Sequence, residues 1–217
     1  MDVIPDIPQG LSKTRVEALS DGVFAIAMTI LVFDIKLPVL APSLSPHELL
    51  HALANQWPYF VSYFVSFTVL GMFWTAHNAF FHFFFRTTTR VLIQLNMLYL
   101  MFIALIPFSA HFIGTHEDSE LAITIYGMNV VIIGALAFIM FKYALYSHDI
   151  DTSHIPSRVI TQARIRILLP PSFALLGMVI VWVSHGLALF FFAFPVIFNL
   201  IPGTLDFSER LLGIELK

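Results

Sequence analysis

The sequence contains no cysteine and has few charged residues among its 217 positions. Without cysteine, the chain can form neither a disulfide nor a thiolate nucleophile, and a cysteine-based metal site is excluded. Charged residues make up 12% of the chain, against roughly 25% in typical soluble domains. Hydrophobic residues make up 58%, and the mean hydropathy is +0.84. This balance indicates a protein with several membrane-spanning segments.

Several motifs of soluble proteins are also missing. There is no glycine-rich phosphate loop, no run of basic residues and no recognisable nucleophile motif. These absences argue against a nucleotide site, a nucleic-acid partner and an enzyme. The first residues lack a basic segment followed by an apolar core, so we expect the first helix to act as its own signal anchor.

Long apolar stretches, separated by proline and charged residues, predict an all-α membrane protein with six transmembrane helices. About 20 residues, at a rise of about 1.5 Å each, cross the core of a bilayer. The expected helices cover residues 14–36, 57–85, 91–113, 121–146, 166–184 and 187–201. Pro107 is expected to kink the third of them. Ser45, Pro46 and Glu48 predict a short interfacial helix before the second. We treat residues 1–217 as a single six-helix domain without an obvious internal repeat.

The distribution of Lys and Arg predicts the orientation of the chain. With six spans, both termini and the loops after the second and fourth helices lie on the same side of the membrane. That side carries ten Lys and Arg residues, and the other side carries only Lys36. Because these residues concentrate on the cytoplasmic side, we expect both termini in the cytoplasm.

The first helix combines a long apolar run with a carboxylate near one end. Asp21 lies inside the expected membrane boundary, where an acid is costly and typical of a functional site. Helix geometry places five polar residues of three helices at one depth: Ser20, Asp21, His77, Asn78 and Asn96. Such side chains hydrogen-bond across helices, either as plain structural contacts or as a gating or proton-sensing network. Arg15 and His77 are candidate partners for the Asp21 carboxylate.

Another face of the first helix carries a mainly apolar stripe. At about 100° per residue, the stripe contains Leu19, Gly22, Ile26, Thr29, Ile30, Phe33 and Leu37. Asp21 points well away from the centre of this stripe. By composition alone, the stripe indicates contact with lipid or with another helix.

Three segments resemble the transmembrane protein 175 family of potassium channels. Residues 15–22, RVEALSDG, resemble its first-helix signature of Arg, three residues, Phe, Ser and Asp, with Leu19 at the position of the Phe. Residues 73–80, FWTAHNAF, resemble its second helix, and residues 96–108 resemble its third. Together these segments represent about the first half of the chain.

The resemblance implies a cation channel that prefers potassium. Family members lack the Thr-Val-Gly-Tyr-Gly filter of ordinary potassium channels, and this sequence lacks it too. Animal members carry two six-helix repeats, whereas bacterial members carry one repeat and assemble as tetramers. The single repeat here therefore implies a homotetramer in the plasma membrane of a prokaryote, with the first helix of each subunit lining the pore. The resemblance implies K⁺ as the permeant ion and neither a cofactor nor a bound metal.

The resemblance also assigns roles to individual residues. Ile26, five residues after Asp21, takes the constriction position, and Thr29 takes that of a hydroxyl implicated in selectivity. Ile30 and Phe33 continue the stripe and are expected to form further rings. Four copies of Ile26 around an axis make an apolar constriction that gates by dewetting. The implied packing network behind the pore helix consists of Arg15, Ser20, Asp21, His77 and Asn78.

Two other functions remain open from the residues. A proton-coupled secondary transporter would use Asp21 and His77, and a membrane scaffold would conduct nothing. Transporters place polar sites or broken helices near the bilayer midplane, whereas the middle of this first helix is apolar and unbroken. We therefore expect a passive, leak-type potassium channel, which ion-flux measurements distinguish from both alternatives.

Overall fold

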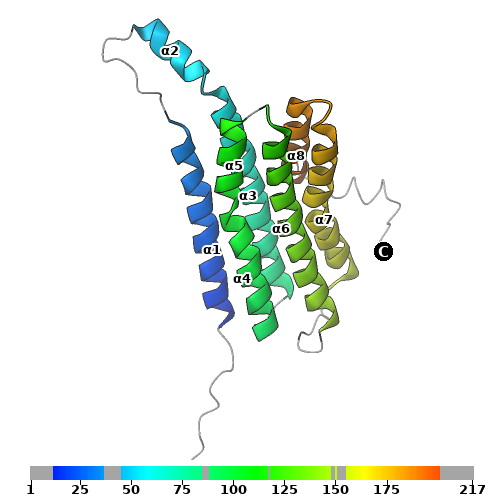
Figure 1. Ribbon diagram of the computed structural model, residues 1–217. Helices are drawn as coiled ribbons and strands as arrows, with labels where there is room; N and C mark the ends of the chain where they lie inside the picture. Colours follow the sequence, from blue (N-terminus) through cyan, green and yellow to red (C-terminus); the bar gives the residue numbers. More distant parts are fainter. Residues whose placement is uncertain are drawn as a thin grey trace, which may run out of the picture.

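The structure is a computed structural model that describes residues 12–36, 45–84, 88–116, 118–147, 150 and 155–200. Its elements are α1 (Lys13–Ile30), the 3-10 turn η1 (Leu31–Asp34), α2 (Pro46–Ala54), α3 (Trp57–Phe84), α4 (Arg90–Ala104), α5 (Ile106–Thr115), α6 (Glu120–Tyr146), α7 (Ser157–Ile180) and α8 (His185–Leu200). Figure 1 shows a bundle of long, roughly parallel helices, with α2 projecting from one end. All elements of the described residues are helical, which confirms the expected all-α class.

Five stretches of this bundle are long and apolar enough to cross a membrane. They are Lys13–Asp34, Trp57–Phe84, Arg90–Thr115, Glu120–Tyr146 and Ser157–Ile180. The sixth expected span, 187–201, corresponds to α8, which has 16 residues. This is shorter than the roughly 20 residues of a standard spanning helix.

The third span is divided at Leu105 into α4 and α5. The division lies directly before Pro107, which is in the first turn of α5. A proline lacks the backbone N–H that a continuous helix needs, and its ring clashes with the preceding turn. The expected kink at Pro107 is therefore confirmed.

The fifth helix begins earlier than the expected 166–184. It starts at Ser157, directly after Pro156, and Pro170 and Pro171 lie buried inside it. Prolines are tolerated within membrane helices where neighbouring helices accommodate them. Here Gly134 of α6 provides the space, because an added Cβ at Gly134 would lie 2.5 Å from the Cγ of Pro171. The expected start at residue 166 was therefore wrong.

The short helix α2 has a well-formed beginning. The Ser45 hydroxyl and the Ser45 backbone N–H donate to the Glu48 carboxylate at 2.7 and 2.8 Å. These hydrogen bonds hold the pKa of the Glu48 carboxyl below its usual range. Leu49, Leu50 and Leu53 are exposed along the helix. A helix with such an apolar surface beside polar ends suits a position at the membrane surface.

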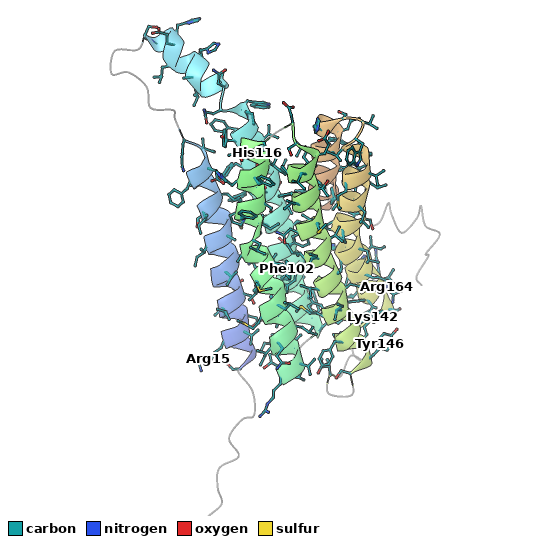
Figure 2. The ribbon with its side chains drawn as sticks, in the orientation of Figure 1. Arg15, Phe102, His116, Lys142, Tyr146 and Arg164 are labelled. Carbon is teal, nitrogen blue, oxygen red and sulfur yellow. The ribbon has the colours of Figure 1, made fainter. Side chains whose placement is uncertain are left out.

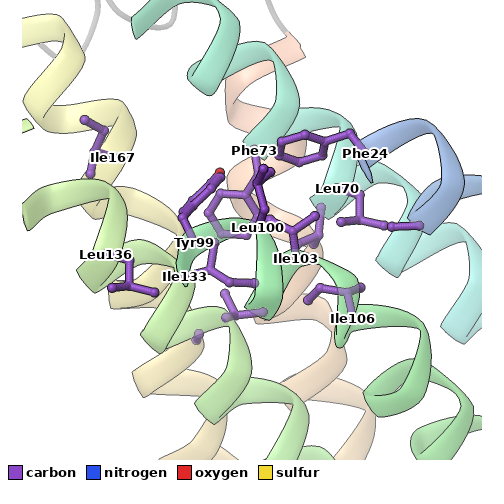
Figure 3. Close-up of a cluster of buried hydrophobic side chains, with 14 of the residues drawn as sticks. Phe24, Leu70, Phe73, Tyr99, Leu100, Ile103, Ile106, Ile133, Leu136 and Ile167 are labelled. Carbon is purple, nitrogen blue, oxygen red and sulfur yellow. The ribbon is translucent and has the colours of Figure 1, made fainter. Parts of the chain in front are cut away.

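The interior of the bundle is a cluster of buried apolar side chains from α1 and from α3 to α8, part of which is drawn in Figure 3. Phe24 of α1, Phe73 of α3 and Tyr99 of α4 are each at most 4% exposed. The rings of Phe24 and Tyr99 lie 6.2 Å apart. Within a membrane, such close packing stabilises helix association through van der Waals contact, since lipid is as apolar as the side chains. The cluster therefore fixes α1 against α3 and α4.

Candidate functional site

The helix α1 stands at one edge of the bundle and packs through a single face (Figure 1). Its buried residues are Val16, Ser20, Phe24 and Ala27, continued in η1 by Leu31. Their spacing of three and four residues is that of one helical stripe. Because this stripe faces α3, α4 and α5, the opposite side of α1 is left uncovered by the described residues of its own subunit.

The four predicted pore residues lie on the uncovered side of α1 and η1. Ile26, Ile30 and Phe33 are 60%, 44% and 70% exposed. Thr29 is also exposed, and its hydroxyl donates to the carbonyls of Ala25 and Ile26 at 2.9 and 3.0 Å. Because a hydroxyl has one proton and two lone pairs, the Thr29 oxygen still has lone-pair capacity for a cation. This side therefore combines bulky apolar groups with one oxygen ligand.

A buried chain of hydrogen bonds joins α1, α3 and α4 behind that face. The Asn96 amide Nδ2 donates to Ser20 Oγ at 3.1 Å, and Asn96 Oδ1 lies 2.8 Å from His77 Nε2. Since the amide oxygen only accepts, His77 donates from Nε2. Ser20 Oγ in turn donates to the carbonyl of Val16 at 2.9 Å. These bonds join Ser20, Asn96 and His77 in one chain, and polar groups in the membrane interior need such partners.

Aromatic rings enclose the imidazole in this chain. The His77 ring stacks on Phe81 at 4.5 Å and on Tyr99 at 5.5 Å between ring centroids. The His77 residue is 7% exposed. The ring is therefore held in one orientation, with Nε2 toward Asn96. This arrangement suits a structural hydrogen bond between helices.

The Asp21 carboxylate has a different partner from the two that the sequence suggested. The indole Nε1 of Trp74 donates to Asp21 Oδ1 at 2.9 Å. Asp21 is exposed in the single subunit. Its hydrogen bond among the described residues goes to Trp74 and not to Arg15 or His77, so that expectation was wrong. Trp74 is three residues before His77, so both lie on neighbouring parts of the α3 surface. This spacing is the signal that sequence reasoning missed.

The remaining predicted network residues lie outside the buried chain. Asn78 is exposed on α3, and Arg15 is exposed near the beginning of α1, at the lower end in Figure 2. Helix geometry had placed Asn78 at the right depth but gave no direction around the bundle. The structure brings Ser20, His77 and Asn96 together and leaves Arg15 and Asn78 on the surface.

The opposite end of α1 is also attached to the bundle through a carboxylate. Asp34 Oδ1 in η1 lies 2.9 Å from His111 Nδ1 in α5. The uncovered stretch between Asp21 and Asp34 is thus tied at both ends and is mainly apolar between them. Among the described residues, no group of His, Asp and Glu is arranged to hold a metal ion.

Comparison with known protein families gives a match to the first half of the chain. The family described as "Endosomal/lysosomal potassium channel TMEM175" matches residues 15–107. These residues include the uncovered face of α1, the Asp21–Trp74 hydrogen bond and the whole buried chain. The match therefore covers the helices that form and support the candidate site.

Relatives from bacteria and animals show the same similarity. A potassium channel of Streptomyces collinus is 41% identical over 145 residues, which are 65% of this chain and 66% of the relative. A potassium channel of Chamaesiphon minutus is 31% identical over 56% of this chain and 60% of its own length. The bovine endosomal/lysosomal proton channel TMEM175 is 39% identical over 47% of this chain and 22% of its own length. The chain thus spans about two thirds or less of these relatives.

A solved structure has the same architecture over nearly its whole length. The crystal structure of a lysosomal potassium-selective channel TMEM175 homolog from Chamaesiphon minutus matches with a TM-score of 0.72 at 25% identity. The match covers 86% of this chain and 95% of that chain. Sequence family, bacterial relatives and fold agree, and the chain belongs to the TMEM175 family of ion channels.

Proposed function

We propose that this protein is a subunit of a potassium-selective, leak-type channel in which four copies of α1 line the pore. The observation that carries the proposal is the uncovered face of α1, where Ile26, Ile30 and Phe33 are exposed. A closed ring of subunits covers such a face in every copy equally. The names of the bacterial relatives, which are potassium channels, support the choice of ion.

Each residue of the face has a role in conduction under this proposal. Rings of Ile26 and Ile30 form an apolar constriction that resists wetting and so limits the leak. The Thr29 oxygens between them replace part of the hydration shell of a passing ion. Ions move down their electrochemical gradient, so K⁺ is the permeant ion and no cofactor is needed.

The position of the cations suggests the orientation of the subunit. Arg15, Lys142 and Arg164 lie toward the lower end in Figure 2, and His116 lies at the upper end. Because Lys and Arg concentrate on the cytoplasmic side, we place the lower end in the cytoplasm. With α8 as a sixth span, both termini are then cytoplasmic, in the plasma membrane of a prokaryotic cell.

Proton permeation is a second candidate function, because the vertebrate relatives are named proton channels. A proton-coupled transporter that uses Asp21 and His77 fits the geometry less well. His77 is buried behind α1 and bonded to Asn96, while Asp21 is bonded to Trp74 on another flank. Among the described residues, each group is therefore bonded to a different partner, which counts against proton transfer between them.

The test is ion flux through the purified protein in liposomes. We expect potassium to move faster than sodium, with no flux in protein-free liposomes, and native mass spectrometry is expected to give the mass of four chains. Proton flux without potassium flux would favour the second candidate. A folded protein that passes neither ion would refute the channel proposal and favour a scaffold.

A further inference from the structure

Arg166 is a cation deep within α7. It lies about 13 Å along the helix axis from Ser157, where α7 begins. Its Nε is buried and without a hydrogen-bond partner in the described part of the chain. A guanidinium stays protonated in proteins, and a charge at this depth of a membrane helix is costly unless it is compensated. The position therefore suits an anionic ligand.

A narrow groove leads to Arg166 along the contact between α3 and α7. It has a volume of about 90 Å³, and Ala76, Ala79 and Ala163 line it together with Gln162 and Phe83. The three alanines leave space that longer side chains would fill. Since Phe83 lies at the end of α3 near the basic side of the bundle, the groove connects Arg166 with that side.

A wider groove continues beyond Arg166 and is mainly apolar. It has a volume of about 380 Å³, and its lining includes Met28, Phe67, Met72 and Val196 as well as Arg166. A cation between a narrow entry and an apolar groove matches an amphiphile, with its anionic group at the cation and a hydrocarbon chain beyond it. A free inorganic anion would leave the apolar part unused.

The surroundings of α7 indicate that the amphiphile is a lipid. The wider groove lies between α1, α3 and α8, and its lining rings Phe67 and Trp74 are 37% and 39% exposed. Open apolar surface at the depth of a membrane helix suits contact with an acyl chain. Lys142 lies toward the same lower end (Figure 2). Basic pockets between membrane helices on the cytoplasmic side attract anionic headgroups.

We propose that Arg166 binds the phosphate of an anionic phospholipid from the cytoplasmic leaflet, with an acyl chain in the wider groove. The planar guanidinium presents its N–H groups as a fork that matches two phosphate oxygens. The phosphate reaches it through the alanine-lined groove and compensates its charge. This inference rests on the proposed membrane orientation, but its test measures lipid binding rather than ion flux, so either proposal can fail alone.

The test is native mass spectrometry of the delipidated, purified full-length channel with added phosphatidylglycerol or phosphatidylcholine. We expect Arg166→Gln to weaken phosphatidylglycerol binding at least about tenfold, the usual size for loss of a charge-assisted hydrogen bond. Arg164→Gln is the matched control, because Arg164 is an exposed arginine on a different side of α7. It removes the same charge and is expected to bind as the wild type does. Equal loss of phosphatidylglycerol binding in both variants, or unchanged binding in both, would overturn the proposal. Unchanged binding is also the result expected if a carboxylate of a neighbouring subunit compensates the charge of Arg166.

Two further measurements distinguish a lipid phosphate from free phosphate and test the site even if Arg166→Gln misfolds. Millimolar inorganic phosphate should not displace phosphatidylglycerol from the wild type, and full displacement would indicate a site for free anions instead. Ala163→Leu keeps Arg166 but narrows the groove, so it is expected to lower phosphatidylglycerol binding even if Arg166→Gln does not fold. Unchanged binding by a folded Ala163→Leu channel would contradict the proposed path.

Discussion

The indole of Trp74 and the carboxylate of Asp21 form a hydrogen bond of 2.9 Å that joins α3 to one flank of α1. One residue earlier, Ser20 receives the amide of Asn96 at 3.1 Å on a flank about 100° away. These two bonds lie at one depth and restrain α1 from two directions. They therefore set the rotation of α1, which in turn decides that Ile26 faces outward.

The Asp21–Trp74 bond is expected to support assembly. Trp74→Phe removes the indole donor and keeps an aromatic ring, and Asp21→Ala removes the acceptor. We expect each change to lower the thermal stability of the tetramer, with a coupling of about 0.5–1.5 kcal/mol between them. Thermal unfolding of both single variants and the double variant measures this coupling. Trp182→Phe is the control, because its indole is 77% exposed. If the losses of stability in Trp74→Phe and Asp21→Ala simply add in the double variant, the hydrogen bond does not contribute to stability.

The buried chain is expected to be sensitive to loss of its central amide. Asn96→Ala leaves both Ser20 Oγ and His77 Nε2 without their partner, which costs about 1–2 kcal/mol for such groups. Gln94→Ala removes an exposed amide two residues earlier on α4 and is expected to change stability by less than about 0.5 kcal/mol. Denaturation in detergent, followed by circular dichroism, compares the two. Similar stabilities would mean that the chain contributes nothing measurable.

The proposed constriction makes Ile26 sensitive to polarity. Ile26→Asn places four amides at the narrowest ring and favours wetting, so we expect faster potassium flux or weaker selectivity over sodium, by about tenfold or less. Liposome flux with both ions measures this effect. Ala25→Asn introduces the same amide at an exposed position about 100° around α1, and its flux should remain near that of the wild type. An Ile26→Asn tetramer with unaltered flux and selectivity would rule out a constriction there.

The contact between Gly134 and Pro171 has no space for a side chain. An alanine Cβ at position 134 would meet the Pro171 ring at 2.5–2.9 Å, and a proline ring cannot turn away. We therefore expect Gly134→Ala to lower stability by about 1–3 kcal/mol, as overpacking does. Gly71→Ala, whose Cβ would lie 3.8 Å from Met28, serves as the control. Comparable melting temperatures for the two variants would show that α6 and α7 can separate at little cost.

Rise per residue and hydropathy were enough to predict much of the fold. Apolar stretches bounded by charges predicted where the membrane helices lie, and Pro107 predicted the break between α4 and α5. The same reasoning placed Ser20, His77 and Asn96 at one depth, and the structure brings them into one chain of hydrogen bonds. It failed at α7, because the polar residues before 166 are compatible with a helix that begins at Ser157, and Pro170 and Pro171 lie inside this helix without ending it.

Position along a helix axis follows from the sequence, because each residue adds a fixed rise. Rotation about that axis does not, because it depends on which side chains of the neighbouring helices fit together. The sequence alone therefore determined that Ser20, His77 and Asn96 share a depth and that Ile26, Ile30 and Phe33 share a face. Only the tertiary structure decided that this face is uncovered, that Trp74 binds Asp21, and that Asn78 points away from the chain that Asn96 completes.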